Sequence, residues 1–392
     1  MTGRFAARIE AATPAGRDRA VDALRALAIA GVIGGHWLVT ALVPGGPHGV
    51  GGAGGVGGRT LLDESPLASM HMLDPVSWIF QTLAVFFLVG GYSAARGYRG
   101  GYRTWLRHRM ARLSRPVVLL AAVWIPVTVG LCLAGVSEQV IRTVLTLVID
   151  PLWFLGIYAL MTALTPVAMA LARRFGAFAA VIPVAVVAAV DLVRFGLSGP
   201  GWAGWINVVA GWFVPYLLGV AWALGSLRGR KGPALMLAGG AAATAALIVW
   251  AGYPASMVGV NGSRISNLNP LTLAAVTFAI AQCGLALLLR EPLRRWMRRP
   301  AAWAIVAVAN MSAMTLFLWH QTAFILVNSV GLLVGRVPGL GTAPTSLAWV
   351  AERLAWLPVF AITLLGLWAI FHRAEHGGAK RRRVVPAGAG PA

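Results

Sequence analysis

The chain has 392 residues, of which 58% are hydrophobic and only 11% are charged, and its 33 basic and 12 acidic residues give a net charge of +21. A soluble protein carries about a quarter charged residues, so this composition excludes an ordinary soluble domain. The positive excess is typical of nucleic-acid-binding proteins, but its distribution along the chain argues against that class.

Apolar runs of near 20 residues recur along the whole length, and each is long enough to cross a hydrocarbon core of about 30 Å. The sequence therefore predicts an all-α fold, a polytopic membrane helical bundle of about ten transmembrane helices. The predicted spans are 22–43, 76–95, 117–135, 152–172, 177–195, 205–225, 234–252, 271–289, 303–328 and 351–371.

Basic residues concentrate in the N-terminal segment and in every second loop of this arrangement. All but six of the 33 fall there or at the inner end of the first span, the exceptions being Arg59, Arg142, Arg194, Arg264, Arg336 and Arg353. Because Lys and Arg gather on the cytoplasmic side of membrane proteins, both termini are predicted to be cytoplasmic. We expect a multi-pass protein of the cell (plasma) membrane. Anionic lipid or a phosphate-bearing ligand, and not nucleic acid, is the expected partner of its basic face.

Three regions follow from this pattern. Residues 1–20 form a cytoplasmic N-terminal segment, 21–372 a transmembrane domain, and 373–392 a basic cytoplasmic tail that is expected to be disordered. A glycine-rich tract within 44–75 is expected to be a flexible outer segment whose role does not follow from its composition. The oligomeric state does not follow either.

The first predicted span carries two ionisable residues on one face. Arg25 and His36 are eleven residues apart, which places them about 20° apart after three full helical turns, with the imidazole about 16 Å deeper in the bilayer. Ionisable groups at such depth are costly and suggest function. A neutral histidine there can act as a general base. The alternative is a structural histidine bonded to a neighbouring span.

Two further groups of polar residues stand out. Arg109 and Arg112 lie at i and i+3 in the basic loop after the second span, so two guanidinium groups can converge on one phosphate; the alternative is an ordinary inner loop. His320 and Gln321 interrupt the ninth predicted span, either as cavity-lining or as structural residues. Asp150 is expected at the outer mouth of the fourth span. No grouping suggests a metal site.

Five segments together resemble the acyltransferase-3 family of integral membrane acyltransferases. The run RAVDALRALAIAGVIGGH at 19–36 resembles the family's Arg/Lys-x10-His hallmark in the first span. The likeness continues, in order, with FFLVGGY at 86–92, RMAR at 109–112, LWFL at 152–155 and LFLWHQ at 316–321. These segments are in register with the ten predicted spans and cover about 20 to 372. Gly90 and Gly91 stand in the family's Ser/Gly-Gly positions and are assigned no chemistry.

The resemblance implies an enzyme, an acyltransferase that moves an acyl group, most often acetyl, from cytoplasmic acyl-CoA to a hydroxyl of a sugar, polysaccharide, lipid or glycosylated metabolite. Acyl-CoA, with acetyl-CoA preferred, would be the donor, and a carbohydrate or lipid-linked molecule the acceptor. His36 would be the catalytic histidine, Arg25 would help to hold the donor, and Arg109 and Arg112 would bind its phosphates. His320 would be a second catalytic residue that stabilises the oxyanion.

Further expectations concern an alternative function, a second transfer step and the source of the protein. The alternative function is a membrane transporter or flippase with a polar, helix-lined path, against which stand the lack of internal repeats and of paired acidic residues in the spans. No esterase-like domain follows the spans in this sequence, so a second transfer step would need a partner or would not occur. The Arg/Ala/Gly-rich composition suggests a bacterial source. Acceptor identity and acyl chain length cannot be predicted from these residues.

Overall fold

The computed structural model describes residues 2–14, 16–45, 60–259, 265–335 and 337–376. The tail motif Lys380–Arg383 and the glycine-rich tract 46–59 lie outside these ranges. The described elements are α1 Thr2–Ala11, α2 Arg19–Val39, β1 Ala41–Gly45, β2 Thr60–Glu64, α3 Pro66–Ser69, η1 His71–Val76, α4 Ser77–Phe80, α5 Leu83–Gly97, α6 Tyr102–Leu133, α7 Glu138–Ala163, α8 Thr165–Phe175, η2 Gly176–Ala180, α9 Val181–Asp191, η3 Leu192–Gly196, η4 Gly201–Ala203, α10 Gly204–Ala223, α11 Lys231–Ala251, α12 Leu273–Trp296, α13 Pro300–Met311, α14 Ala313–Val334 and α15 Leu347–His376.

Among these residues, ten helical stretches are long and apolar enough to cross a membrane, which confirms the predicted polytopic bundle. Helices α8 and α9 form one such stretch with their connecting turns, and η1, α4 and α5 form another. The chain is therefore a multi-pass membrane protein. The described residues form one antiparallel pair of strands, in which Ala41 lies opposite Glu64 and Gly45 opposite Thr60.

Two predicted boundaries were wrong. Helix α7 begins at Glu138, fourteen positions before the predicted span at 152–172, because the Ser137 side chain caps its first turn. That turn also carries an exposed ion pair between Arg142 and Glu138, at 2.6 Å. Asp150 is consequently in the middle of α7 and not at an outer mouth. The predicted span 303–328 is divided between α13 and α14, which meet at Ser312.

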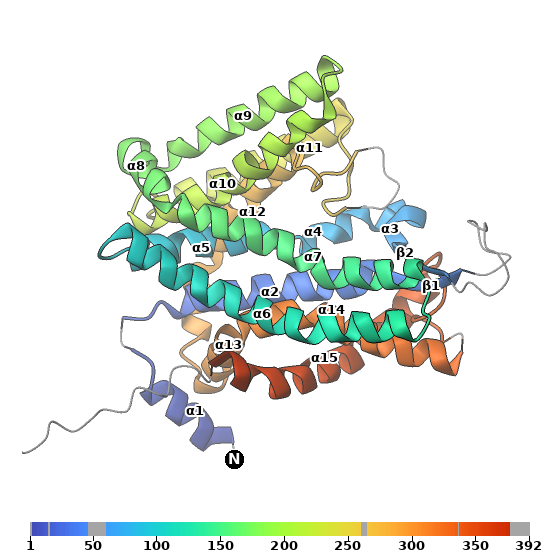
Figure 1. Ribbon diagram of the computed structural model, residues 1–392. Coiled ribbons are helices and arrows are strands. Elements are labelled where there is room, and N and C mark those ends of the chain that lie inside the picture. The colour runs from blue at the N-terminus through green and yellow to red at the C-terminus, as the bar shows by residue number, and fades with distance from the viewer. Residues whose placement is uncertain (1, 15, 46–59, 260–264, 336, 377–392) are drawn as a thin grey trace, which may run out of the picture.

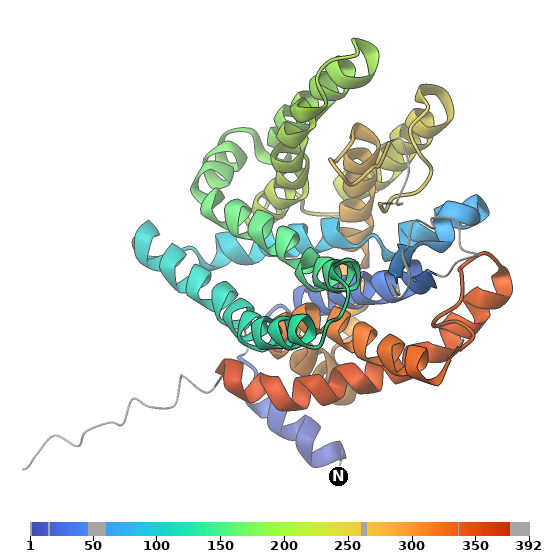
Figure 2. The same cartoon turned by 45° about the vertical axis from the view of Figure 1, so that its right-hand side comes forward.

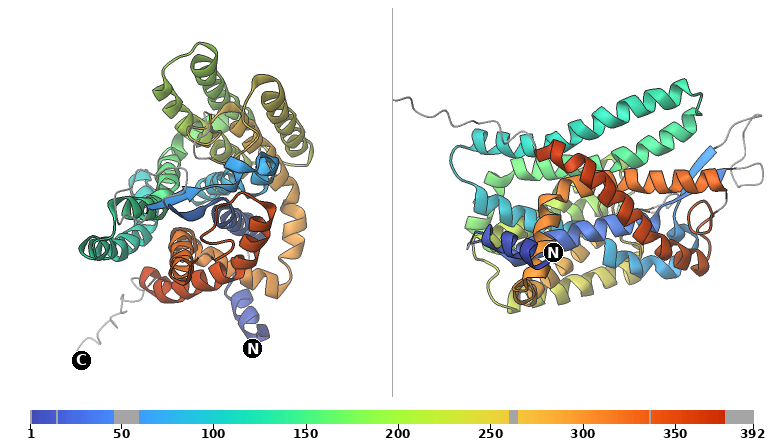
Figure 3. Two further views of the ribbon diagram at one scale, coloured as in Figure 1. Left: turned by 90° about the vertical axis from the view of Figure 1, so that its right-hand side faces the viewer. Right: turned by 90° about the horizontal axis from the view of Figure 1, so that it is seen from below.

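Figure 1 shows α1, the C-terminal end of α15 and the α5–α6 connection towards the same, left-hand end of the bundle. We call this the basic end; it includes Arg19, Gly97 and Arg109. Figures 2 and 3 show α9 to α12 on one side of the molecule and α13 to α15 on the other, with α2 running between the two groups. Helix α2 contacts α5, α12, α13, α14 and α15, so it is the element best placed to gather residues from the whole bundle.

Close helix packing brings α5 against α10. A Cβ added to Gly91 would meet the carbonyl oxygen of Tyr216, and one added to Gly219 would meet that of Leu88. Glycines allow two membrane helices to approach this closely, since packing between backbones provides much of the association energy in lipid. Gly91, the second glycine of the FFLVGGY segment, therefore has a packing role.

Burial separates central from peripheral spans. In α2, α10, α12 and α14, more than half of the most apolar stretch is buried, whereas only 11% of that stretch is buried in α6, α11 and α15. The peripheral helices therefore present their side chains outward, where a spanning helix meets lipid. Polar side chains of α2 and α14 are enclosed by the other helices, and these are the helices that carry the two candidate histidines.

Candidate active site

Arg25 joins three helices near the basic end. Its guanidinium donates to the Ser93 hydroxyl of α5 at 2.7 Å, to Asn310 of α13 at 3.4 Å and to Asp22, one turn earlier on α2, at 3.3 Å. Asp22 is itself bound by Arg17 at 2.6 Å, so its charge is shared by two arginines. A quarter of the Arg25 side chain remains exposed. Arg25 is thus held in one orientation and still accessible.

Ser93 also receives the second predicted arginine. The Arg109 Nη2 donates to the Ser93 carbonyl at 3.1 Å, and the Arg109 guanidinium lies 5.2 Å from the centre of the Trp105 ring. One residue of α5 therefore binds Arg25 through its hydroxyl and Arg109 through its backbone. Ser93 was not among the predicted site residues. The feature that could have identified it is a hydroxyl in an apolar helix, directly after the Gly90-Gly91-Tyr92 segment.

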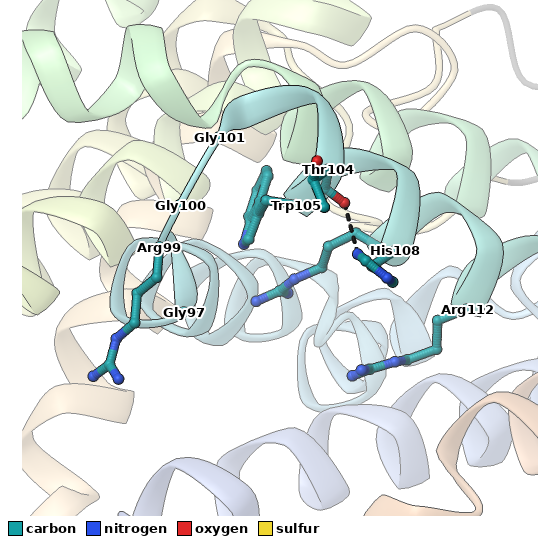
Figure 4. Close-up of a pocket in the computed structure, with 9 residues that line it drawn as sticks. Gly97, Arg99, Gly100, Gly101, Thr104, Trp105, His108 and Arg112 are labelled. Atoms are coloured by element: carbon teal, nitrogen blue, oxygen red, sulfur yellow. Dashed lines mark hydrogen bonds between the residues drawn. The ribbon is translucent and has the colours of Figure 1, made fainter. Parts of the chain in front are cut away.

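Arg109 and Arg112 line the same pocket, as their spacing predicted. This cavity of about 350 Å³ opens at the basic end between the end of α5 and the first turns of α6. Figure 4 shows Arg99 and Arg112 on opposite sides of the pocket, with Trp105 and His108 between them. Three guanidinium groups around one cavity suit a ligand with several phosphate oxygens. Arg99 belongs to this group as well.

The two predicted histidines lie together in the middle of the bundle. The rings of His36 on α2 and His320 on α14 have centroids 5.1 Å apart at an interplanar angle of 60°. The Gln321 side-chain amide lies 3.1 Å from His36 Nδ1. Next to His36, the Trp37 indole donates to the His320 carbonyl at 3.1 Å and fixes the two helices in register.

The hydrogen bond of His320 determines which of its nitrogens carries the proton. Its Nδ1 is 2.5 Å from the Phe317 carbonyl, and because a carbonyl only accepts, Nδ1 must donate. The Nε2 of a neutral His320 then presents a lone pair, and this buried atom has no partner among the described residues. The oxyanion-stabilising role expected of His320 does not fit this arrangement, since Nε2 has no proton to donate.

Asp150 is a carboxylate that the structure relates to His36. From the middle of α7 it interacts electrostatically with His36. Sequence reasoning placed Asp150 at the membrane surface and gave it no role, because the start of α7 was predicted too late. A carboxylate in an apolar helix was the signal that could have identified it.

The structure therefore gathers the five predicted residues into two groups. Arg25, Arg109 and Arg112 lie at the basic end. His36 lies about 16 Å further along α2, and His320 of α14 lies beside it. The lining of the arginine pocket includes neither histidine. Helix α2 is the direct connection between the groups, since it carries both Arg25 and His36.

A comparison with protein-family models identifies the family to which this chain belongs. The model described as an acyltransferase domain, that of acyltransferase 3, matches residues 18–372. The chain belongs to the acyltransferase-3 family. No curated protein and no solved structure shows a significant match to it.

Membership in the acyltransferase-3 family makes this chain an integral-membrane acyltransferase. The match spans α2 to α15, so it includes both groups of residues. Transfer of an acyl group to a nucleophile needs a base for the nucleophile's proton and a site that holds the donor. In this acyltransferase-3 member, the histidine pair carries a nitrogen lone pair and the arginine pocket carries three cationic donors.

Proposed function

We propose that this acyltransferase-3 member transfers an acetyl group from cytoplasmic acetyl-CoA to a hydroxyl of a carbohydrate or lipid-linked acceptor at the cell membrane. The observation that carries the proposal is that one helix, α2, holds His36 beside His320 and also holds Arg25, which shares Ser93 with Arg109. Donor-binding and proton-accepting groups are thereby fixed relative to each other.

The donor's phosphates bind at the basic end. Arg112 is exposed at the pocket, and Arg109 is held in place by the Ser93 carbonyl, so the two can act as a preformed cradle for phosphate oxygens. The basic end is cytoplasmic in this proposal, which agrees with the positive-inside pattern. The thioester arm extends along the α2 face from Arg25 towards His36.

The chemical step takes place at His36. Its Nε2 removes the proton of the acceptor hydroxyl while the hydroxyl oxygen bonds to the thioester carbonyl carbon. The carbon–sulfur bond then breaks, and the proton returns from His36 to the leaving thiolate, which gives an ester and free CoA thiol. This role needs a proton on Nδ1 of His36, held by the amide oxygen of Gln321. Turning that amide by 180° exchanges its nitrogen and oxygen and leaves the heavy-atom geometry alike.

His36 is the base and His320 the supporting residue in this proposal. His36 is partly exposed, whereas His320 is fully buried, so a substrate hydroxyl has access to His36 first. The lone pair of His320 Nε2, in a ring centred 5.1 Å from that of His36, can accept a hydrogen bond from a second hydroxyl of the acceptor and orient it. The Asp150 carboxylate stabilises the imidazolium that His36 becomes.

The proposal is tested with purified full-length protein in lipid nanodiscs, supplied with acetyl-CoA and a panel of sugars and polyprenyl glycosides. Release of CoA thiol that depends on the acceptor, with ester formation seen by mass spectrometry, is the expected result; a transporter would release none. The His36→Ala variant should lose about 10²- to 10⁴-fold in rate. His71→Ala, in an exposed turn, is the matched control and should keep full activity. Undiminished turnover by His36→Ala would remove this histidine from the chemistry.

A further inference from the structure

Arg353 on α15 is a buried cation without a counter-ion. It is 0% exposed, and its Nη2 donates to the Thr40 carbonyl at 2.9 Å. Its Nε and Nη1 have no hydrogen-bond partner among the described residues, and no ion pair found between those residues includes Arg353. An enclosed guanidinium normally has its donors satisfied and its charge paired, because desolvation costs several kcal/mol per ion.

Aromatic rings surround this guanidinium in place of a carboxylate. It lies 4.8 Å from the centre of the Trp349 ring, 5.4 Å from that of Phe324 and 5.5 Å from that of Phe360. Ring faces stabilise a cation, but they carry no net charge and do not satisfy N–H donors directed at an anion. Two in-plane donors of Arg353 are therefore left without a hydrogen-bond acceptor among the described residues.

The position of Arg353 relates it to both histidines. Thr40, whose carbonyl Arg353 binds, lies one helical turn beyond His36, and its N–H donates to the His36 carbonyl at 3.2 Å. Phe324, under the guanidinium, lies one turn beyond His320 on α14. Arg353 is thus one turn, about 6 Å along the helix axis, past both rings, on the side away from Arg25.

A second unsatisfied group lies on the same face of α14. His320, Phe324 and Asn328 follow at intervals of four residues, so they form one stripe. Asn328 is 1% exposed, and its Oδ1 has no partner in the described part of the chain. An amide oxygen accepts a hydrogen bond from a hydroxyl, and a guanidinium donates to an anion.

We propose that Arg353 binds an oxyanion of the acyl acceptor, a phosphate or a carboxylate, and so selects acidic acceptors. This inference rests on the proposed function and adds to it a second anion site, on the opposite side of His36 from the donor arginines. An oxygen of the oxyanion accepts a charge-assisted hydrogen bond from Nη1, which has no partner among the described residues. The acceptor's hydroxyl then lies about one helical turn away, at His36, and neutral acceptors lack this contact.

Binding of matched ligand pairs tests the proposal. The full-length protein in zwitterionic nanodiscs is titrated with farnesyl phosphate against farnesol, and with glucuronate against glucose, and the shift in unfolding temperature gives each apparent affinity. We expect one anionic ligand to stabilise the protein while its neutral counterpart does not; the pair that responds distinguishes a lipid phosphate from an acidic sugar. Arg353→Met should weaken that affinity by roughly 30-fold or more.

Controls separate this site from the donor site. Arg142→Met removes an exposed arginine and should leave the anion affinity unchanged, and acetyl-CoA should still stabilise Arg353→Met. Equal stabilisation by the anionic and neutral members of both pairs would overturn the proposal, as would full anion affinity in Arg353→Met. If Arg353→Met does not fold, two other measurements decide the outcome. These are the binding of the matched ligand pairs to the wild-type protein and their binding to Arg353→Lys, which keeps the charge but loses the guanidinium donors. Absence of acetyl-CoA binding by the wild-type protein would instead contradict the proposed function.

Discussion

The imidazole rings of His36 and His320 lie with their centres 5.1 Å apart, although they belong to the first and the ninth spans of the chain. Their two helices are fixed against each other at this level by the Trp37 indole, which donates to the His320 carbonyl. The pair is therefore a feature of the packed bundle, and each ring has its own partner: Gln321 for His36 and the Phe317 carbonyl for His320.

Replacing Gln321 by Leu should lower kcat on the order of 10²-fold, because the His36 ring loses the group that fixes its orientation and tautomer. Gln321→Glu should recover most of the rate, since a carboxylate also accepts from Nδ1–H. Steady-state kinetics of CoA release measure both variants. Equal rates in Gln321→Leu and the wild type would show that the 3.1 Å contact has no part in catalysis.

Arg112→Gln should raise KM for acetyl-CoA about tenfold with little change in kcat, because a phosphate contact acts on donor binding before the chemical step. Arg107→Gln is the matched control: it removes an exposed arginine of the same helix that does not line the pocket. The effect of Arg112→Gln should shrink in high salt, where exposed charges are screened. Parallel rises in KM for both variants would indicate a general effect of positive charge.

Gly91→Ala should destabilise the bundle by about 1–3 kcal/mol, since the new methyl group would overlap the Tyr216 carbonyl and separate α5 from α10. Gly130→Ala, at a helical glycine with open space around it, should be neutral or slightly stabilising. Thermal unfolding in detergent compares them. Similar unfolding temperatures for the two variants would contradict the close α5–α10 contact.

Tyr253 should make stability fall at alkaline pH. Burial, together with the Asp191 carboxylate that its hydroxyl binds at 2.9 Å, raises the pKa of Tyr253 above its ordinary value of about 10. Above that ordinary value the folded protein keeps a proton that the unfolded chain loses, so the stabilisation is complete below about pH 10 and declines as pH rises further. Tyr253→Phe should be less stable at pH 8 and lose less stability up to pH 11. An unchanged slope in Tyr253→Phe would assign the alkaline loss to other groups.

The orientation of the bundle is open to direct labelling. Arg107→Cys, at the basic end, should react with a membrane-impermeant maleimide only after cells are permeabilised, whereas Arg142→Cys, at the start of α7, should react in intact cells. Cys132→Ser and Cys283→Ser provide the background without native thiols. The reverse pattern would invert the predicted topology and place the arginine pocket outside.

The sequence by itself determined the number of spans and the stripe that joins Arg25 to His36. Both are properties of one segment at a time: an apolar run sets a membrane crossing, and a step of eleven residues returns to the same helix face. The spacing of Arg109 and Arg112 predicted a shared pocket for the same reason. The start of α7 was predicted too late because Asp150, within an apolar run, suggested a boundary, whereas the helix begins at the Ser137 cap.

Only the tertiary structure decided which residues meet across helices. Ser93 between two arginines, Asp150 near His36, and Arg353 enclosed by three rings all depend on contacts between distant segments. Hydropathy cannot give these contacts, since lipid is as apolar as the side chains and does not specify a helix's partners. Interlocking small residues and hydrogen bonds such as Trp37 to His320 set them, and these exist only once the helices are assembled.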